Sequence, residues 1–274
     1  DAFVRSILID FNAAGLQVNL LHVKDACRAI RKTVDEDFTN DDWVPVLPGD
    51  KYPVKIAKHF NGDISDILWP SLAQQLFPRD AFNKDLRVAQ VGDRLYASVF
   101  IDLFPKEIKA FSTLLSKILP AKIPWRMSFL VSGGGLVSLK VKRAIAGLLS
   151  FASAQNRLIN DSISLLDYIE LNSDDAVVKL QVTATTWAPL EEEELLRTRA
   201  SQLSRAIQGW GSCNVAEFCG DAFGGAVSSM LALSRTSYAS ATVASLADVI
   251  YMLPFFRPCS PWESGSLLFR SPDG

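Results

Sequence analysis

A short glycine-rich stretch is the first candidate for chemistry in this sequence. Residues 132–135 (Ser-Gly-Gly-Gly) lie between a predicted strand and a predicted helix, the position of phosphate-binding loops. A Walker A loop requires GxxxxGK[S/T], and no Gly-Lys-Ser or Gly-Lys-Thr occurs in the sequence. A dinucleotide-binding loop would need a third glycine at the position of Ser138. We interpret the stretch as a flexible turn and predict no cofactor-binding residue.

Grouped carboxylates are the second candidate, because paired acids can perform acid–base or metal chemistry. Asp35-Glu36-Asp37 and Asp174-Asp175 place acids side by side, and residues 191–194 are consecutive glutamates. Neighbouring acids at turns are usually solvated or cap backbone N–H groups. An acidic run also favours the first turn of a helix, where it complements the helix dipole. We therefore predict no catalytic residue.

The thiols and imidazoles are too scattered to predict a metal centre. A zinc site needs about four nitrogen or sulfur ligands at short paired spacings, and no CxxC pair occurs. We predict reduced, mostly packed thiols, as in a cytosolic protein. No GxSxG nucleophile motif is present either. The residues concerned are Cys27, Cys213, Cys219, Cys259, His22 and His59.

Composition indicates a globular chain without an unusual charge. The 274 residues are 49% hydrophobic and 21% charged, and 28 basic and 30 acidic residues give a net charge of −2. This balance does not favour a nucleic-acid partner, which would need clustered basic charge. The aromatic RNA-recognition pattern is absent, and its nearest equivalent, Arg126-Met127-Ser128-Phe129, lacks the flanking residues.

The sequence predicts neither a signal peptide nor a membrane span. The most apolar stretch, residues 243–256, contains Asp248 and Pro254 and is shorter than the roughly 20 residues that a bilayer requires. The chain begins without methionine and ends at Pro272-Asp273-Gly274. We therefore expect it to be a piece of a longer protein.

Two strand–helix–strand units are predicted to position these residues. Alternation in 95–103 and 125–131 indicates strands, with a helix after Pro105 between them. Alternation in 178–185 indicates a third strand, followed by a helix from the 191–194 acidic run to Gly209 and a returning strand at 213–219. Paired units of this kind predict an α+β fold, a ferredoxin-like antiparallel sheet with helices on one face.

The remaining elements define the predicted domain organisation. Residues 1–86 are predicted as an N-terminal α/β segment with helices at 3–14 and 23–36, a strand at 16–21, a loop, and a helix at 64–77 bent at Pro70. Residues 87–222 are predicted as the ferredoxin-like core with a helical insertion at 136–171. Helices at 222–233 and 240–253 would form a helical return over 223–257, and 258–274 would begin a linker or strand to a further domain.

An apolar segment near the end of the sequence is the candidate interaction site. Residues 251–258 are unusually apolar for a connector, and apolar surface on a soluble domain often marks a contact. The segment could pack on its own domain or on a following one, or it could bind a separate protein or the membrane face. The candidate contact residues are Tyr251, Leu253, Phe255, Phe256, Arg257 and Trp262.

The last residues also carry a resemblance to a protein family. Arg257-Pro258, Ser260-Pro261-Trp262, Leu268-Phe269-Arg270 and Pro272-Asp273-Gly274 resemble the segment that leads into the motor domain of type IV secretion and conjugation ATPases. The similarity is greatest to the Dot/Icm and IncI-plasmid branch, which contains the DotO/IcmB and TraU proteins. Residues 91–98 resemble the N-terminal region of that branch, so the likeness covers about thirty residues.

The resemblance implies a non-catalytic docking and assembly domain. In this family the nucleotide-binding loop, with ATP and Mg²⁺, lies downstream of the matching segment, and none of the matching positions is catalytic. The parent would be a hexameric ATPase at the cytoplasmic face of the bacterial inner membrane, in contact with other secretion subunits. Two alternatives remain: a single-stranded nucleic-acid-binding module on a ferredoxin-like sheet, and a small enzyme with a cryptic site.

Overall fold

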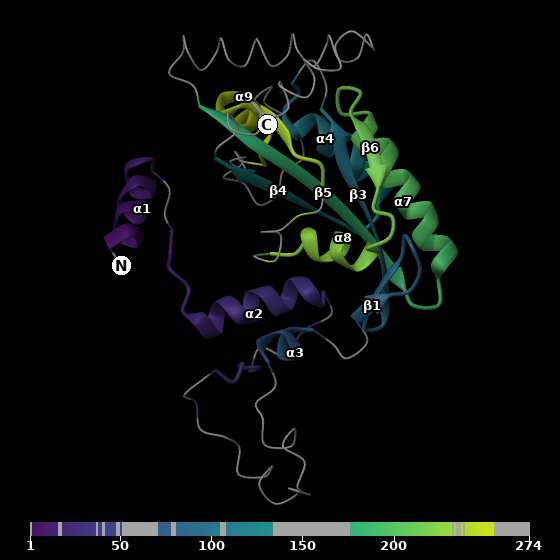
Figure 1. Ribbon diagram of the computed structural model, residues 1–274, viewed down its shortest axis with the longest axis horizontal. Helices are drawn as coiled ribbons and strands as arrows, with labels where there is room; N and C mark the ends of the chain where they lie inside the picture. The colour runs from purple at the N-terminus through teal and green to yellow at the C-terminus, as the bar shows by residue number, and fades with distance from the viewer. Residues whose placement is uncertain are drawn as a thin grey trace, which may run out of the picture. The chain divides into compact units, whose positions relative to one another are not determined.

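The computed structural model divides the chain into two compact units, Asp1–Arg79 and Asp80–Gly274, each considered separately below. The second unit begins before the predicted boundary at 86, because β1 (Ala81–Asn83) pairs with β2 (Ala89–Val91). The structure describes residues 2–15, 18–36, 38–39, 42–47, 50, 71–77, 81–104, 108–133, 176–231, 233, 237 and 239–254 (Figure 1). The predicted helical insertion at 136–171 and the segment at 258–274 lie outside these residues.

The first unit contains three described helices, α1 (Ala2–Ala13), α2 (Val23–Val34) and α3 (Leu72–Leu76). The first two confirm the helices predicted at 3–14 and 23–36. The strand predicted at 16–21 is wrong for its described part, since 18–21 belong to no strand. Alternating residues form a strand only where a neighbour completes the hydrogen-bonded ladder. Of the predicted helix at 64–77, only α3 and its flanking residues are described.

Arg31 joins α2 to α3 within this unit. Its Nη1 donates a hydrogen bond to the carbonyl oxygen of Gln75 at 3.1 Å and another to that of Leu76. Its guanidinium carbon also lies 5.2 Å from the centre of the Phe38 ring. A cation near the end of α3 satisfies carbonyl groups that have no partner inside the helix. The side chain of Ser71 caps the other end of α3 by accepting from the backbone N–H of Gln74.

The second unit is built on an antiparallel sheet, so the protein is α+β. Its described strands include β3 (Arg94–Leu103), β4 (Trp125–Ser132), β5 (Val177–Pro189), β6 (Asn214–Glu217) and β7 (Thr242–Ser245). Their order is β1-β2-β3-β5-β4, with β6 also beside β3 and β7 also beside β5. The strands predicted at 95–103, 125–131, 178–185 and 213–219 are thereby confirmed, each with slightly different ends.

The two predicted strand–helix–strand units are present and their strands interleave. The first runs β3, α4 (Phe111–Ile118), β4, and the second runs β5, α7 (Glu193–Gln208), β6. Because β3 pairs with both β5 and β6, and β5 also pairs with β4, the spatial order is β6-β3-β5-β4. The first helix begins later than predicted, since residues 108–110 are not helical.

The main core lies between one face of this sheet and helices α4 and α7. Alternate strand residues such as Val99 and Val182 point into it, and the fully buried Trp210 follows α7. The shorter helix α9 (Leu246–Met252) adds Val249 and Met252 to the same cluster. β5 is buried on both faces along its centre, as expected for the strand between β3 and β4.

The prediction that helices cover only one face is wrong. Helix α8 (Ala222–Ser228) lies on the opposite face, beside Phe218, whose ring packs at 5.0 Å against that of Phe100. Phe100 alternates with the core residue Val99 and therefore points away from the core. Helix α8 is also shorter than the predicted 222–233, and it begins where Asp221 accepts a hydrogen bond from the N–H of Gly224.

The predicted helix at 240–253, part of the predicted helical return over 223–257, also needs correction. Residues 242–245 form strand β7, which pairs with residues 177–180 of β5, and the helix begins only at Leu246. β5 extends past the end of β3, so its edge offers free backbone groups that β7 completes. The Ser245 side chain then starts α9 by accepting a hydrogen bond from the N–H of Asp248.

Candidate docking surface

Helix α9 presents an apolar surface where the segment that was predicted to make contacts begins. Its inner residues Val249 and Met252 are fully buried in the core, which fixes the rotation of the helix. That rotation turns Ile250 and Tyr251 outward, where they are 51% and 59% exposed. Two large apolar side chains on a firmly anchored helix can bind a partner without the cost of ordering a loop.

The predicted contact residues separate into three groups. Tyr251 is exposed and available for contact. Leu253 instead packs partly buried against the core of its own domain, and its N–H donates to the carbonyl oxygens of Val249 and Ile250, so it is not a free contact residue. Phe255, Phe256, Arg257 and Trp262 lie outside the described residues.

Ile250 was missed by the sequence prediction, although a signal existed. In a helix that begins at Leu246, residues three apart share a face, so Val249 and Met252 point one way and Ile250 and Tyr251 another. The prediction concentrated on the apolar run from 251 onward and did not use the helical spacing before it.

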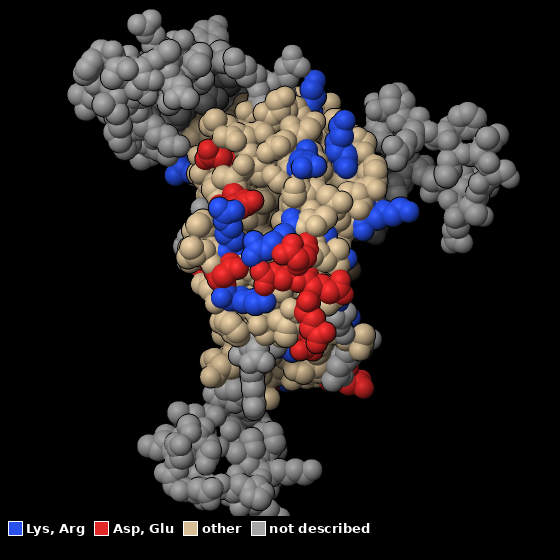
Figure 2. Space-filling view, turned by 90° about the vertical axis from the view of Figure 1, so that its right-hand side faces the viewer, with Lys and Arg blue, Asp and Glu red and all other residues tan. Residues whose placement is uncertain are grey.

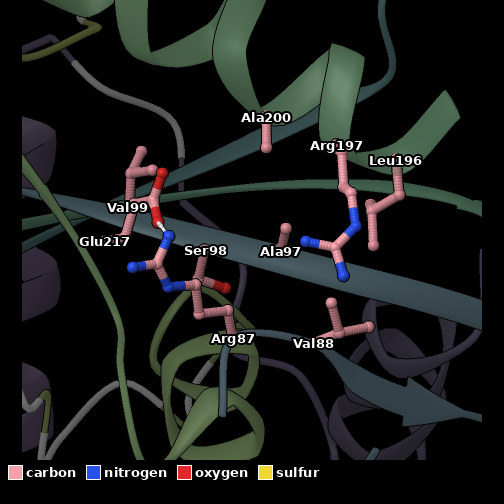
Figure 3. A pocket seen from close by; sticks show the side chains of 9 residues that line it. All are labelled: Arg87, Val88, Ala97, Ser98, Val99, Leu196, Arg197, Ala200 and Glu217. Carbon is pink, nitrogen blue, oxygen red and sulfur yellow. Dashed lines mark ion pairs between the residues drawn. The ribbon is translucent and has the colours of Figure 1, made fainter. Parts of the chain in front are cut away.

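A small hollow in the second unit is a second candidate site. It has a volume of about 140 Å³ and lies between β3, α7 and the turn after β1 (Figure 3). Val88 and Leu196 form part of its wall, and Arg87, Arg197 and Glu217 supply its charges. Ligand pockets usually measure about 300–1,000 Å³, so this hollow is too small for a nucleotide.

The arginines of the hollow are already neutralised by carboxylates. Arg87 pairs with Glu217 at 2.8 Å, and Arg197 pairs with Glu193 at 2.6 Å. Glu193 also contacts Lys84 at 2.9 Å, and the hydrogen bonds from Lys84 and then Arg197 hold its pKa below the ordinary value. In Figure 2 acidic and basic side chains mix in a band across this face. The hollow therefore offers no excess charge to an anionic ligand.

The remaining reactive groups do not converge on a site in the described part of the chain. No cluster of three or more His, Cys, Asp or Glu side chains there could hold a metal ion. Cys27 and Cys213 are buried free thiols, whereas Cys219 is exposed. Burial raises the pKa of Cys213 to about 11, which leaves it protonated at neutral pH and unsuited to nucleophilic attack.

The other sequence candidates have structural roles or lie outside the described residues. The acidic run is confirmed as a helix start, since α7 begins at Glu193. His22 precedes α2 without capping it through its side chain. Asp174, Asp175 and His59 lie outside the described residues, as do two glycines of the 132–135 turn.

The RNA-recognition-like stretch is engaged inside the protein. The guanidinium carbon of Arg126 lies 5.7 Å from the ring centre of Trp187, and its Nε donates to the hydroxyl of Ser229 at 3.1 Å. Both Trp187 and Arg126 lie on the sheet face that α8 partly covers. This arrangement leaves less open sheet for stacking bases than an RNA-binding platform requires.

No protein-family model matches this sequence, and no curated protein is similar to it. The function must therefore be inferred from the residues and surfaces of the chain itself. No helix in the described ranges is long and apolar enough to cross a membrane.

Proposed function

We propose that this chain is a non-catalytic docking and assembly domain of a type IV secretion or conjugation ATPase. The observation that carries the proposal is the position of α9. Its inner face is anchored in the core, its outer face exposes Ile250 and Tyr251, and it leads directly into the segment that resembles this family. A helix anchored in the core in this way can fix the orientation of the following segment relative to this domain.

The proposal extends to the parent protein and its location. The parent carries the Walker A loop, ATP and Mg²⁺ in a following domain, assembles as a hexamer, and works at the cytoplasmic face of the bacterial inner membrane. There it contacts other subunits of the secretion system. The apolar outer face of α9 supports an interdomain or intersubunit contact, because such surface gains free energy when it is covered.

The fold supplies a second line of support. The spatial order β6-β3-β5-β4 is that of two interleaved strand–helix–strand units, and we propose that it is the predicted ferredoxin-like arrangement. Such a sheet is a rigid scaffold that needs no ligand pocket to serve as an assembly module. The small, charge-balanced hollow is consistent with that role.

Two experiments test the proposal. The gene that encodes the parent should contain GxxxxGK[S/T] downstream of residue 274, and its absence would contradict the assignment. In the full-length parent, the double substitution Ile250→Ser and Tyr251→Ser should lower ATPase activity or shift the hexamer to smaller species in light scattering. Leu231→Ser, at a residue that is 53% exposed outside α9, is the matched control. Unchanged activity and assembly in the α9 double variant would remove α9 from the proposal.

A further inference from the structure

Unpaired basic side chains and an exposed leucine occur at the end of α4 and in the last turn of α7. We call this group the basic patch; it consists of Lys117, Leu119, Lys122 and Arg205, and all four residues are exposed. Lys117 and Arg205 lie in the last turns of α4 and α7. Lys122 directly follows the short 3-10 helix Leu119–Ala121.

Contacts between α4 and α7 bring Lys117 and Arg205 near one another. A Cβ placed on Gly209 would lie 3.8 Å from Cδ of Lys117, so the Lys117 side chain lies against the end of α7. The N–H of Gly209 bonds to the carbonyl oxygen of Arg205 at 3.0 Å, which places Arg205 one helical turn away. Trp210, which follows α7, donates to the carbonyl oxygens of Lys109 and Ala110 just before α4, so the two helices are held side by side.

The basic patch differs from the mixed band of charged residues around the hollow. Arg87, Arg197 and Lys84 in that band are paired with acids. Among the described residues, Lys117, Lys122 and Arg205 form no ion pair. Figure 2 shows Lys and Arg side chains without acidic neighbours above the mixed band.

Helix dipoles explain only part of the basic patch. Positive side chains in a last helical turn are favourable, which accounts for Lys117 and Arg205. Lys122 lies outside both helices, in a left-handed backbone conformation with φ of 50°, which is uncommon for a residue with a side chain. Leu119 is 54% exposed on a tight turn that Pro120 stiffens. Leu119 is thus an exposed apolar side chain that lies close to Lys117 and Lys122 along the chain.

We propose that the basic patch docks onto an anionic lipid surface, with the cations on the headgroups and Leu119 inserted between them. An acidic peptide would need a groove to hold its backbone, and the hollow described above lies elsewhere. A lipid surface needs only a protruding apolar residue framed by positive charge. This inference rests on the proposed role at the inner membrane and assigns that role a contact surface.

Vesicle sedimentation with the 274-residue chain tests the inference. The chain should sediment with vesicles of phosphatidylcholine and phosphatidylglycerol and stay in solution with phosphatidylcholine alone, and added salt should release it. The triple variant Lys117→Gln, Lys122→Gln, Arg205→Gln should bind more than tenfold more weakly, since each cation near an anionic surface contributes about fivefold. Leu119→Ser should weaken binding several-fold, and Leu231→Ser should not.

The matched control removes the same charge from the mixed band by Lys84→Gln, Arg87→Gln and Arg197→Gln. Circular dichroism establishes that each variant is folded. Three results would overturn the proposal. They are an equal loss of binding in both triple variants, no vesicle binding by the unsubstituted 274-residue chain, and tighter binding to polyglutamate or single-stranded DNA than to the vesicles. Failure here leaves the α9 experiment unaffected, because that experiment measures ATPase activity and assembly.

Discussion

Trp210 is hydrogen-bonded to Ala110: the indole Nε1 donates to the Ala110 carbonyl oxygen at 3.0 Å, and to that of Lys109 at the same distance. The indole is fully buried and its ring meets Phe111 nearly edge-on, with centres 6.4 Å apart. The Trp210 side chain thus links the end of α7 to the start of α4. It also lies in the core cluster that contains residues of both strand–helix–strand units.

Replacing Trp210 by Phe should therefore destabilise the second unit by about 2–4 kcal/mol. The change leaves two carbonyl groups without their donor and opens a void in a packed core. Urea unfolding followed by circular dichroism measures the change. Trp125→Phe, at a half-buried position, should cost less, and an equal loss for both variants would show that the Trp210 hydrogen bonds contribute nothing.

Gly225 should tolerate no side chain. A Cβ there would lie 2.7 Å from Cγ of Phe218, so Gly225→Ala should destabilise the protein by about 1–3 kcal/mol through overpacking. Gly133→Ala is the control, since a Cβ at Gly133 meets nothing within 4 Å. Adding Phe218→Leu to Gly225→Ala should restore part of the lost thermal stability if the ring contact is the cause.

The Glu193 ion pairs should make stability depend on pH in the acid range. The folded-state pKa of Glu193 is below its ordinary value of 4.5, chiefly through the hydrogen bond from Lys84. Its contribution to stability is therefore present above about pH 4.5 and is lost as the carboxylate is protonated at lower pH. Glu193→Gln should lower the melting temperature at neutral pH and make little difference at about pH 3. Glu191→Gln is the control, and an equal effect of Glu193→Gln at both pH values would contradict the assignment.

The cysteines should differ sharply in reactivity. Cys219 is exposed, whereas burial raises the pKa of Cys213 to about 11 and its Sγ donates to the carbonyl oxygen of Trp210. Iodoacetamide at about pH 8 should label Cys219 in the folded chain and label Cys213 only after denaturation, because the thiolate is the nucleophile. Mass spectrometry of tryptic peptides distinguishes the two sites. Fast labelling of Cys213 would mean that the end of α7 opens readily.

Local sequence patterns predicted strands β3, β4, β5 and β6 and helix α7, because the spacing of apolar and charged residues within each segment favours that structure. The acid-first, base-last order of α7 favours a helix within the segment itself, whereas the alternation in β3 also has neighbouring strands that complete its ladder. The strand β7 could not be predicted in the same way, since its four residues become a strand only beside the exposed edge of β5. The burial of Leu253 likewise depends on the rotation that the core imposes on α9.

The placement of α8 also depended on tertiary contacts. Adjacent glycines at 224 and 225 would usually weaken a helix. Here Gly225 allows the close approach to Phe218 that seats α8 on the second face of the sheet. Nothing in the spacing of residues 222–228 indicates which face they cover. The exposed residue Tyr251 could be predicted from the apolar composition of residues 251–258. Identifying Ile250 as exposed required knowing that α9 begins at Leu246.

The position of β5 has a consequence for the order in which the protein can acquire its structure during synthesis. β3 and β4 are not neighbours; each pairs with β5, which follows both in the chain, as in the pairing of Ser98 with Thr185. A nascent chain that has left the ribosome only as far as β4 can pair β1, β2 and β3 with one another, but it has no strand that joins β4 to them. The central sheet assembles only after residue 189 has emerged, so the preceding apolar strands must be kept from aggregating until then.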